Sequence, residues 1–430
     1  MATLALPLRP AGPPTSRRSA AHSLALGLVW LTVASGAIVF SEPAPVDVLT
    51  MGLVVLLPLI GLIDVPRALL ILLGVMLTAS AAGYVSACFA TDYGLAITHT
   101  SVSLYLYVAT FIFAAFVAKR PLAHTRLILN AWGWAGLLAA LAAIVGYFDL
   151  VPGAHDLMTR YDRATGFFKD PNVLGPFLVP AMVYTVQRLA GSSLLKGLRA
   201  LLLLAVVGLA LLLSFSRGAW FNMAVALIIY GALYVLTVPS HRARLKFISL
   251  CVLALLVALA LVPAVLQLDA VSNIASERLS LSQRYDEGPE GRFGGQEKAV
   301  QLAIDNPFGI GAQQFVPNHH HEEPHNVYVT MFLNAGWLGG LVFFGLVWST
   351  AIWGLRHAFV RTTTQPLFQV VYACFVGNAL EGFIIDLDHW RHFYVLLALV
   401  WGLMLSRDGS GVSPLASTFA CLPRRQTRGV

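Results

Sequence analysis

The segment RALLLLAVVGLALLLSFSRGAW, residues 199–220, determines the fold class because it combines an apolar run with a very short polar turn. Residues 199–215 form a helix-length run that can cross a hydrocarbon core of about 30 Å. The turn SFSRGAW at 214–220 leads at once into a second apolar run, 219–237. The segment therefore predicts a hairpin of two membrane-spanning helices, with Arg217 at the outer membrane boundary.

Similar apolar runs recur along all 430 residues. The chain is 57% apolar and only 11% charged, whereas a soluble domain carries about 25% charged residues. We therefore expect an all-α integral membrane protein with about twelve transmembrane helices and a partly helical periplasmic loop. A cleaved signal peptide is the alternative for the first run, although its length favours a retained anchor. The other runs are 21–40, 46–63, 68–90, 100–118, 127–147, 173–189, 247–268, 327–355, 367–385 and 392–405.

The distribution of basic residues predicts the orientation of the chain in the membrane. Short cytoplasmic loops are enriched in Lys and Arg, and placing the amino terminus inside puts a basic residue in every internal loop. The excess of 28 Lys and Arg over 21 Asp and Glu then reflects contact with membrane lipids. No nucleic-acid partner is needed to explain it.

This orientation divides the chain into tails, transmembrane blocks and two long outer loops. Loops of more than about 12–15 residues usually carry function. Within the longer loop we expect surface helices at 273–284, capped by Ser272, and at 293–304, before DNPFGIG. The expected parts are a cytoplasmic tail 1–20, helices 1–9 within 21–268 with the periplasmic loop 148–171, a large periplasmic loop 269–325, helices 10–12 within 326–405 and a cytoplasmic tail 406–430.

The histidine-rich segment NHHHEEPHN, residues 318–326, raises the question of a metal site. Three consecutive histidines, 319–321, cannot all face one ion in a regular element, and a zinc site needs about four ligands in tetrahedral array. The chain also has no Walker, Cys-x-x-Cys or His-Glu-x-x-His motif, and GIGAQQ at 309–314 lacks the third glycine of a dinucleotide fingerprint. We therefore expect no metal and no other cofactor, and a solvated triple histidine.

Three outward-facing elements form an ordered set of motifs. They are RATGFFKDPNVLG at 163–175, SFSRGAW at 214–220, and GRFGGQEKAVQLAIDNPFGIGAQQF at 291–315 followed by PHNVYVTMFLNAGWLGG at 324–340. This set resembles the O-antigen ligase and polymerase superfamily, and the resemblance covers roughly residues 160–345. The chain departs from the family pattern at Gly295 and Gln296. In the family, an aromatic residue often stands at these positions after the loop arginine, which corresponds to Arg292 here.

The resemblance implies a glycosyltransferase of the bacterial inner membrane whose active site faces the periplasm. Such an enzyme moves a glycan from undecaprenyl diphosphate to an acceptor hydroxyl during assembly of lipopolysaccharide or another surface polysaccharide. The dominant single loop favours a ligase, whose acceptor is lipid A-core, over a polymerase, whose acceptor is a second carrier-linked glycan. A polysaccharide transporter or lipid flippase is the rival class, but such proteins usually place several charges at the bilayer midplane.

The resemblance also implies roles for individual residues. Arg217 and Arg292 would bind the diphosphate as its charge develops, since a guanidinium stays charged and matches phosphate oxygens. His325 would accept the proton of the acceptor hydroxyl. The other expected substrate-binding residues are Arg163, Lys169, Asp170, Asn172, Asn326, Glu381 and Arg391, and the short loop with Asp386, Asp388 and His389 could line the same cleft.

Each of these residues has a purely structural alternative. Arg217 could snorkel to lipid headgroups, and Arg292 could pair with Glu290 or Glu297. Glu381, within an apolar run, could pair with an outer arginine. His325 could cap the tenth helix, and Asp170 or Asn172 the sixth.

Overall fold

The computed structural model describes residues 16–190, 194–268 and 291–406 together with positions 271, 274 and 288. Nearly all regular structure within it is helical. The strands are β1 (Thr159–Arg160) and β2 (Arg163–Ala164), which pair as a short antiparallel hairpin. The all-α class is therefore confirmed.

Each apolar run of the sequence coincides with a helix. Within the described residues, seven helices (α3, α4, α5, α8, α9, α10 and α14) are long and apolar enough to cross a membrane. The expected count of about twelve spans remains a prediction. The long helices are α1 (Ser16–Ser35), α2 (Pro45–Ile60), α3 (Arg67–Ala87), α4 (Tyr93–Lys119), α5 (Pro121–Tyr147), α7 (Pro171–Ala190), α8 (Leu194–Leu213), α9 (Arg217–Thr237), α10 (His241–Leu266), α14 (Val327–Ala358), α15 (Gln365–Glu381) and α16 (Arg391–Met404).

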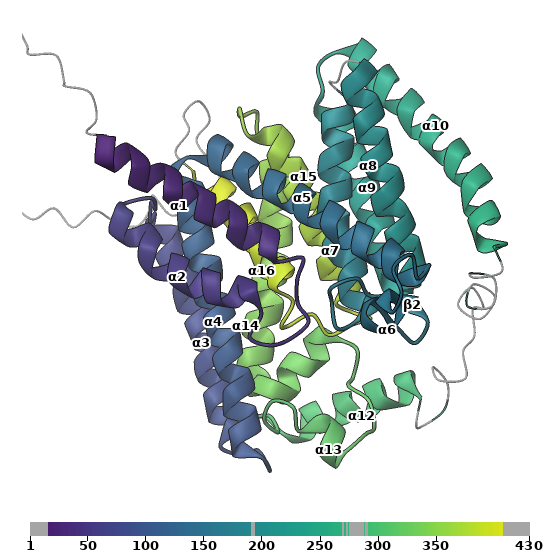
Figure 1. Cartoon of the computed structure of the whole chain (residues 1–430). Coiled ribbons are helices and arrows are strands. Elements are labelled where there is room, and N and C mark those ends of the chain that lie inside the picture. The colour runs from purple at the N-terminus through teal and green to yellow at the C-terminus, as the bar shows by residue number, and fades with distance from the viewer. Residues whose placement is uncertain are drawn as a thin grey trace, which may run out of the picture.

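The short elements α6 (Ala154–Met158), α12 (Arg292–Asp305) and α13 (Phe315–Asn318) gather with β2 at one end of the bundle, the lower end in Figure 1. We call this end the loop end. Helix α12 confirms the helix expected at 293–304. The helix expected at 273–284, with its cap Ser272, lies outside the described residues.

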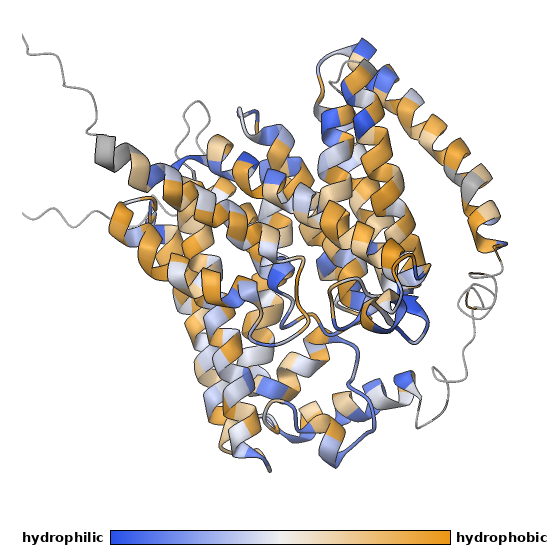
Figure 2. Cartoon of the chain, in the orientation of Figure 1, coloured by the Kyte–Doolittle hydropathy of each residue, from blue (hydrophilic) through white to orange (hydrophobic). Residues whose placement is uncertain are grey.

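Helix α10 shows why the protein needs a membrane. It diverges from the bundle at the right of Figure 1, and Figure 2 colours most of its visible length as hydrophobic. None of its most apolar 18-residue window is buried in the protein. An exposed helix that is apolar all round is stable only in a lipid environment, so this surface indicates contact with acyl chains.

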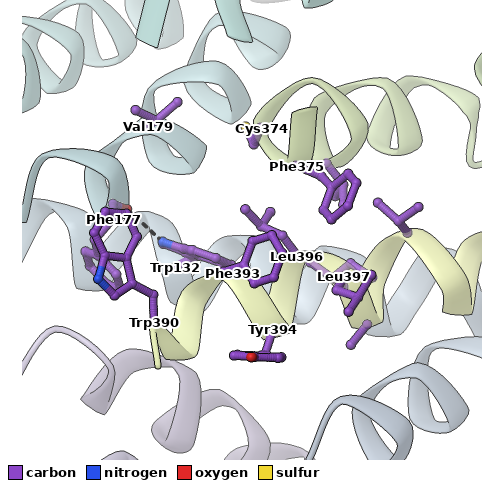
Figure 3. Close-up of a cluster of buried hydrophobic side chains, with 14 of the residues drawn as sticks. Trp132, Phe177, Val179, Cys374, Phe375, Trp390, Phe393, Tyr394, Leu396 and Leu397 are labelled. Carbon is purple, nitrogen blue, oxygen red and sulfur yellow. Dashed lines mark hydrogen bonds between the residues drawn. The ribbon is translucent and has the colours of Figure 1, made fainter. Parts of the chain in front are cut away.

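Aromatic packing around α16 forms the centre of the bundle (Figure 3). Phe393 of α16 stacks on Phe375 of α15 with ring centroids 5.8 Å apart. Trp132 of α5 donates a hydrogen bond of 3.0 Å from Nε1 to the carbonyl oxygen of Phe177 in α7. Buried aromatic side chains of this size dominate core energetics. They hold α5, α7, α15 and α16 together next to the loop end.

Helix α14 has a sharp kink that is stabilised by an exchange of hydrogen bonds. The backbone leaves helical geometry at Ala335 and Gly336. The carbonyl oxygen of Leu333 therefore accepts from Ile310 N at 2.9 Å, while Trp337 N donates to the carbonyl oxygen of Pro307 at 2.8 Å. A straight helix would pair Trp337 with Leu333 directly. The turn at residues 307–311, with the pattern Pro-x-Gly-x-Gly, thus provides partners for the Leu333 carbonyl oxygen and the Trp337 N–H, which the kink separates.

The turn can fit into the kink only because its middle residue is glycine. Gly309 has φ +81°, and a Cβ atom there would lie 2.3 Å from Ser86 Oγ and 2.6 Å from the carbonyl oxygen of Leu333. Both the backbone conformation and the space therefore exclude a side chain.

We predict that Gly309→Ala lowers the free energy of unfolding by at least about 1–3 kcal/mol, the range for a strained backbone residue. The measurement is the apparent melting temperature of the purified protein in detergent. Gly345→Ala is the matched control, because it lies in α14 with no atom within 4 Å of the added methyl group, and we expect it to be neutral or stabilising. Equal melting temperatures for the two variants would contradict the role assigned to the turn.

Candidate functional site

Arg163 is the structural hub of the loop end. It is 6% exposed, and its Nε donates to the carbonyl oxygen of Ser214 at 2.8 Å. Its Nη2 donates to Asn172 Oδ1 at 2.7 Å. One guanidinium therefore links the β1–β2 hairpin to the start of α7 and to the α8–α9 turn. We call this arrangement the Arg163 brace.

Asp170 connects this brace to the start of α14. Its Oδ1 accepts from Asn172 N at 2.7 Å, so it supports the first turn of α7 as an Asx-type cap. The same carboxylate partly opposes the lowering of the pKa of His325 by burial and by Arg292. Both readings of Asp170, cap and site residue, agree with its position.

Arg217 occupies the first position of α9. The turn before it is tight, with Phe215 at φ +46°, and Ser216 caps the helix by accepting from Ala219 N at 3.3 Å. Arg217 is half-buried and is not without an interaction partner. Its backbone position, three residues after the carbonyl that Arg163 binds, places it beside the Arg163 brace.

His325 is held by its backbone. It adopts φ +51°, and its N–H donates to Asp386 Oδ2 at 2.8 Å. Asp386 Oδ1 accepts from the Thr330 hydroxyl at 2.5 Å. The carboxylate of Asp386 thereby joins the α15–α16 loop to the turn before α14 and to its first helical turn.

Asn326 ends this turn as the N-cap of α14. Its Oδ1 accepts from Tyr328 N at 3.1 Å and from Val329 N at 3.4 Å. The cap uses the amide oxygen and not the amide nitrogen Nδ2, which is a hydrogen-bond donor. Asn326 therefore caps α14, and its expected substrate-binding role stays a prediction.

The electrostatic surroundings keep His325 neutral. Burial lowers its pKa below the usual 6.5, and the nearby Arg292 guanidinium lowers it further. Glu322, whose Oε2 lies 3.7 Å from His325 Nε2, and Asp170 oppose this shift. A half-buried neutral imidazole beside an arginine is able to accept a proton.

A cluster of carboxyl groups, formed by Glu323, Asp386 and Asp388, lies close to His325 in the structure. Burial raises the pKa of Glu323 to about 8, with a further contribution from Asp386 and Asp388. Burial and the nearby Asp388 raise the pKa of Asp386 to about 7. Like charges at close range cannot all ionise together, so this cluster holds protons near neutral pH. Asp386 and Asp388 were expected in a short loop that could line the cleft, whereas no pattern in the sequence pointed to Glu323.

The triple histidine is not uniformly solvated, which corrects the sequence-based expectation. His320 is 6% exposed, and its ring packs so closely on Gly295 that a Cβ atom there would lie 2.9 Å from it. Gln296 Nε2 donates to the carbonyl oxygen of His325 at 3.3 Å. The two positions that depart from the family pattern thus dock α12 onto the histidine-rich segment.

Lys169 and Arg391 belong to a second cluster. Arg391 binds Asp47 in bidentate fashion, with Nε–Oδ1 at 2.7 Å and Nη2–Oδ2 at 2.8 Å. Glu42 Oε1 lies 3.6 Å from Arg391 Nη1 and 3.7 Å from Lys169 Nζ. These groups border a cavity of about 250 Å³ with mostly apolar walls, including Val46, Leu106, Phe113, Phe177 and Val395.

Glu381 is fully buried in α15. Its Oε2 accepts from Asn222 Nδ2 at 2.7 Å, so the observed partner is an amide of α9 and not the outer arginine considered from the sequence. A Cβ atom on Gly218 would lie 2.9 Å from Glu381 Oε1. Glu381 therefore packs directly beneath the first turn of α9, next to Arg217.

His99, Asp388 and His389 are the group in the described part of the chain that could hold a metal ion. Their arrangement does not favour it. The two imidazole rings stack with centroids 3.8 Å apart and 19° between planes, whereas a bound ion must lie in the plane of each ring. His389 Nε2 is also 2.9 Å from the Ser103 hydroxyl. Both rings would have to rotate before they could share one ion.

Comparison with known families gives one match. Residues 200–344 match the family model described as O-antigen ligase. This segment contains the α8–α9 turn, α12, the turn at the kink and the start of α14, and it confirms the resemblance drawn from the motifs. A search of the curated proteins finds no match.

Proposed function

We propose that this chain, whose residues 200–344 match the O-antigen ligase family model, is a membrane enzyme that transfers a glycan from undecaprenyl diphosphate to an acceptor hydroxyl. The observation that carries the proposal is the packing of α12, which begins with Arg292, against His325: Gln296 Nε2 donates to the carbonyl oxygen of His325 at 3.3 Å, and burial together with Arg292 lowers the pKa of His325, all within the matched segment. A proton acceptor next to a fixed cation suits a reaction that deprotonates a hydroxyl and releases a diphosphate.

The proposed reaction is a direct displacement. The acceptor oxygen attacks the anomeric carbon as its proton passes to His325 Nε2, and the bond between that carbon and the diphosphate oxygen breaks. Attack from the opposite side inverts the configuration. The negative charge that develops on the diphosphate is stabilised by Arg217 and Arg292, which need not move as the bond breaks.

The ligase reading, with lipid A-core as acceptor, is the one we favour, and the enzyme would then work at the periplasmic face of the bacterial inner membrane. It rests on the single dominant loop at 269–325. A polymerase would use the same catalytic groups with a second carrier-linked glycan as acceptor. Glycan gels of a deletion strain distinguish the two, because loss of all polymer on the core indicates a ligase and a single remaining repeat indicates a polymerase.

We predict that Arg217→Ala and Arg292→Ala each reduce transfer roughly 10- to 150-fold, as expected for loss of a charged hydrogen bond of about 1.5–3 kcal/mol. His325→Ala should cost about 10²–10⁴-fold. Arg217→Lys should also be poor, because a point charge cannot replace the planar fork. The assay is formation of the glycan product by purified protein.

The matched control for these variants is Arg160→Ala. Arg160 is an exposed arginine of the β1–β2 hairpin at the loop end, and it donates to the carbonyl oxygen of Lys169. It should retain near-normal transfer, and membrane abundance should be equal for all variants. Near-normal transfer by two of the three site variants would refute the proposed site.

The proposed orientation is tested by labelling. In a background with Cys88, Cys251, Cys374 and Cys421 changed to Ser, we expect Asn318→Cys to react with an impermeant maleimide on intact spheroplasts. Ser240→Cys, at the N-cap of α10, should react only after permeabilisation. The reverse pattern would place the site in the cytoplasm and exclude the proposed donor and acceptor arrangement.

We also predict that transfer is independent of metal. Purified protein treated with EDTA should keep its activity, since arginines supply the fixed positive charge. His319→Ala/His321→Ala should be active, whereas His320 is left unchanged because it is buried against Gly295. Activity that is lost on chelation and restored by zinc or manganese would show that this prediction is wrong.

A further inference from the structure

A second cavity, of about 360 Å³, lies at the end of the bundle opposite the loop end. It is formed by the start of α5, the last turns of α7 and the connection between α14 and α15. We call it the arginine pocket. Its lining residues are Leu122, Arg126, Asn130, Tyr184, Gln187, Arg188, Thr363, Pro366 and Leu367.

The polar lining of the arginine pocket is cationic or neutral. Arg126 and Arg188 contribute two guanidinium groups, and the lining contains no acidic side chain. Neither arginine takes part in an ion pair among the described residues. Two like charges in one recess repel each other, so an anion between them would be stabilised by both.

A neutral side chain of the lining, Tyr184, positions one of the two arginines. The Cζ of Arg188 lies 5.7 Å from the centre of the Tyr184 ring, a cation–π contact. The Tyr184 hydroxyl donates to Asn130 Oδ1 at 3.0 Å, which links α7 to α5. This bond leaves the Asn130 amide nitrogen as a donor, and Gln187 and Thr363 add further hydrogen-bonding groups.

The ligand that fits this chemistry is a phosphate group. Guanidinium groups bind phosphate oxygens in bidentate fashion, and the amides and hydroxyls supply additional donors. Apolar contacts from Leu122, Pro366 and Leu367 suit the carbon skeleton to which a phosphate is attached. Anionic phospholipids at a membrane surface are one abundant source of such groups, and free phosphate is another.

We propose that the arginine pocket binds a phosphate-bearing anion, from an anionic phospholipid headgroup or from free phosphate. This site is separate from the proposed catalytic groups and does not depend on the glycan transfer. The walls of the pocket come from α5, α7 and the start of α15. A bound anion therefore links these three helices at the end of the bundle opposite the loop end. Ligand bound only by the folded state raises the melting temperature.

The test uses the full-length protein, purified and delipidated in a neutral detergent. One arm adds phosphatidylglycerol, with phosphatidylcholine as the comparison lipid, and the other adds inorganic phosphate, with chloride at equal ionic strength. The readouts are the melting temperature and bound lipid by native mass spectrometry. We expect saturable stabilisation by phosphatidylglycerol or phosphate, and an affinity at least tenfold lower in Arg126→Ala/Arg188→Ala.

The matched control is Arg356→Ala/Arg361→Ala, which removes the same charge from exposed positions outside the pocket lining. It should bind as the unchanged protein does. If the double variant fails to fold, the single variants Arg126→Gln and Arg188→Gln replace it. They retain side-chain bulk, and each should weaken binding. Stabilisation by phosphate alone assigns the site to free phosphate, and stabilisation by phosphatidylglycerol alone assigns it to lipid. Equal loss in the control pair, or no stabilisation in either arm, would overturn the proposal.

Discussion

The carboxylate of Asp386 is the contact on which the arrangement of the site depends. It accepts from the N–H of His325 and from the hydroxyl of Thr330, so it holds a turn in which His325 adopts φ +51°, a conformation uncommon for a residue with a side chain. Through it, the loop between α15 and α16 positions the start of α14. Since α15 and α16 are anchored in the aromatic core, the position of His325 is set by the most rigid part of the bundle.

The kink of α14 performs a related task for α12. The turn at 307–311 replaces the hydrogen bonds lost between Leu333 and Trp337, and it immediately follows α12 in the chain. Trp337 also donates from Nε1 to the carbonyl oxygen of Ala303 at 2.8 Å, at the end of α12. One end of the helix that begins with Arg292 is thereby attached to the same helix that begins just after His325.

The fold class and the helix positions were predictable because hydropathy and periodicity act locally along the chain. The helix at 293–304 was found for the same reason. The brace formed by Arg163, the amide partner of Glu381 and the carboxyl cluster around Glu323 were not predictable. Each joins residues far apart in sequence, and no local pattern shows which charged groups face one another. His320 was misjudged because its burial depends on the absence of a side chain at Gly295.

The central claim is that a neutral His325 accepts the proton of the acceptor hydroxyl, and the pH dependence of transfer tests it most directly. Burial and Arg292 lower the pKa of His325 below 6.5, so the loss of rate caused by protonation of this imidazole should lie below pH 6.5. Any step from Glu323 and Asp386, whose pKa values are raised to about 8 and about 7, should lie above it. His325→Gln should be slow and should lack the limb below pH 6.5. A limb below pH 6.5 that persists unchanged in His325→Gln, or the absence of such a limb in the unchanged protein, would contradict the account.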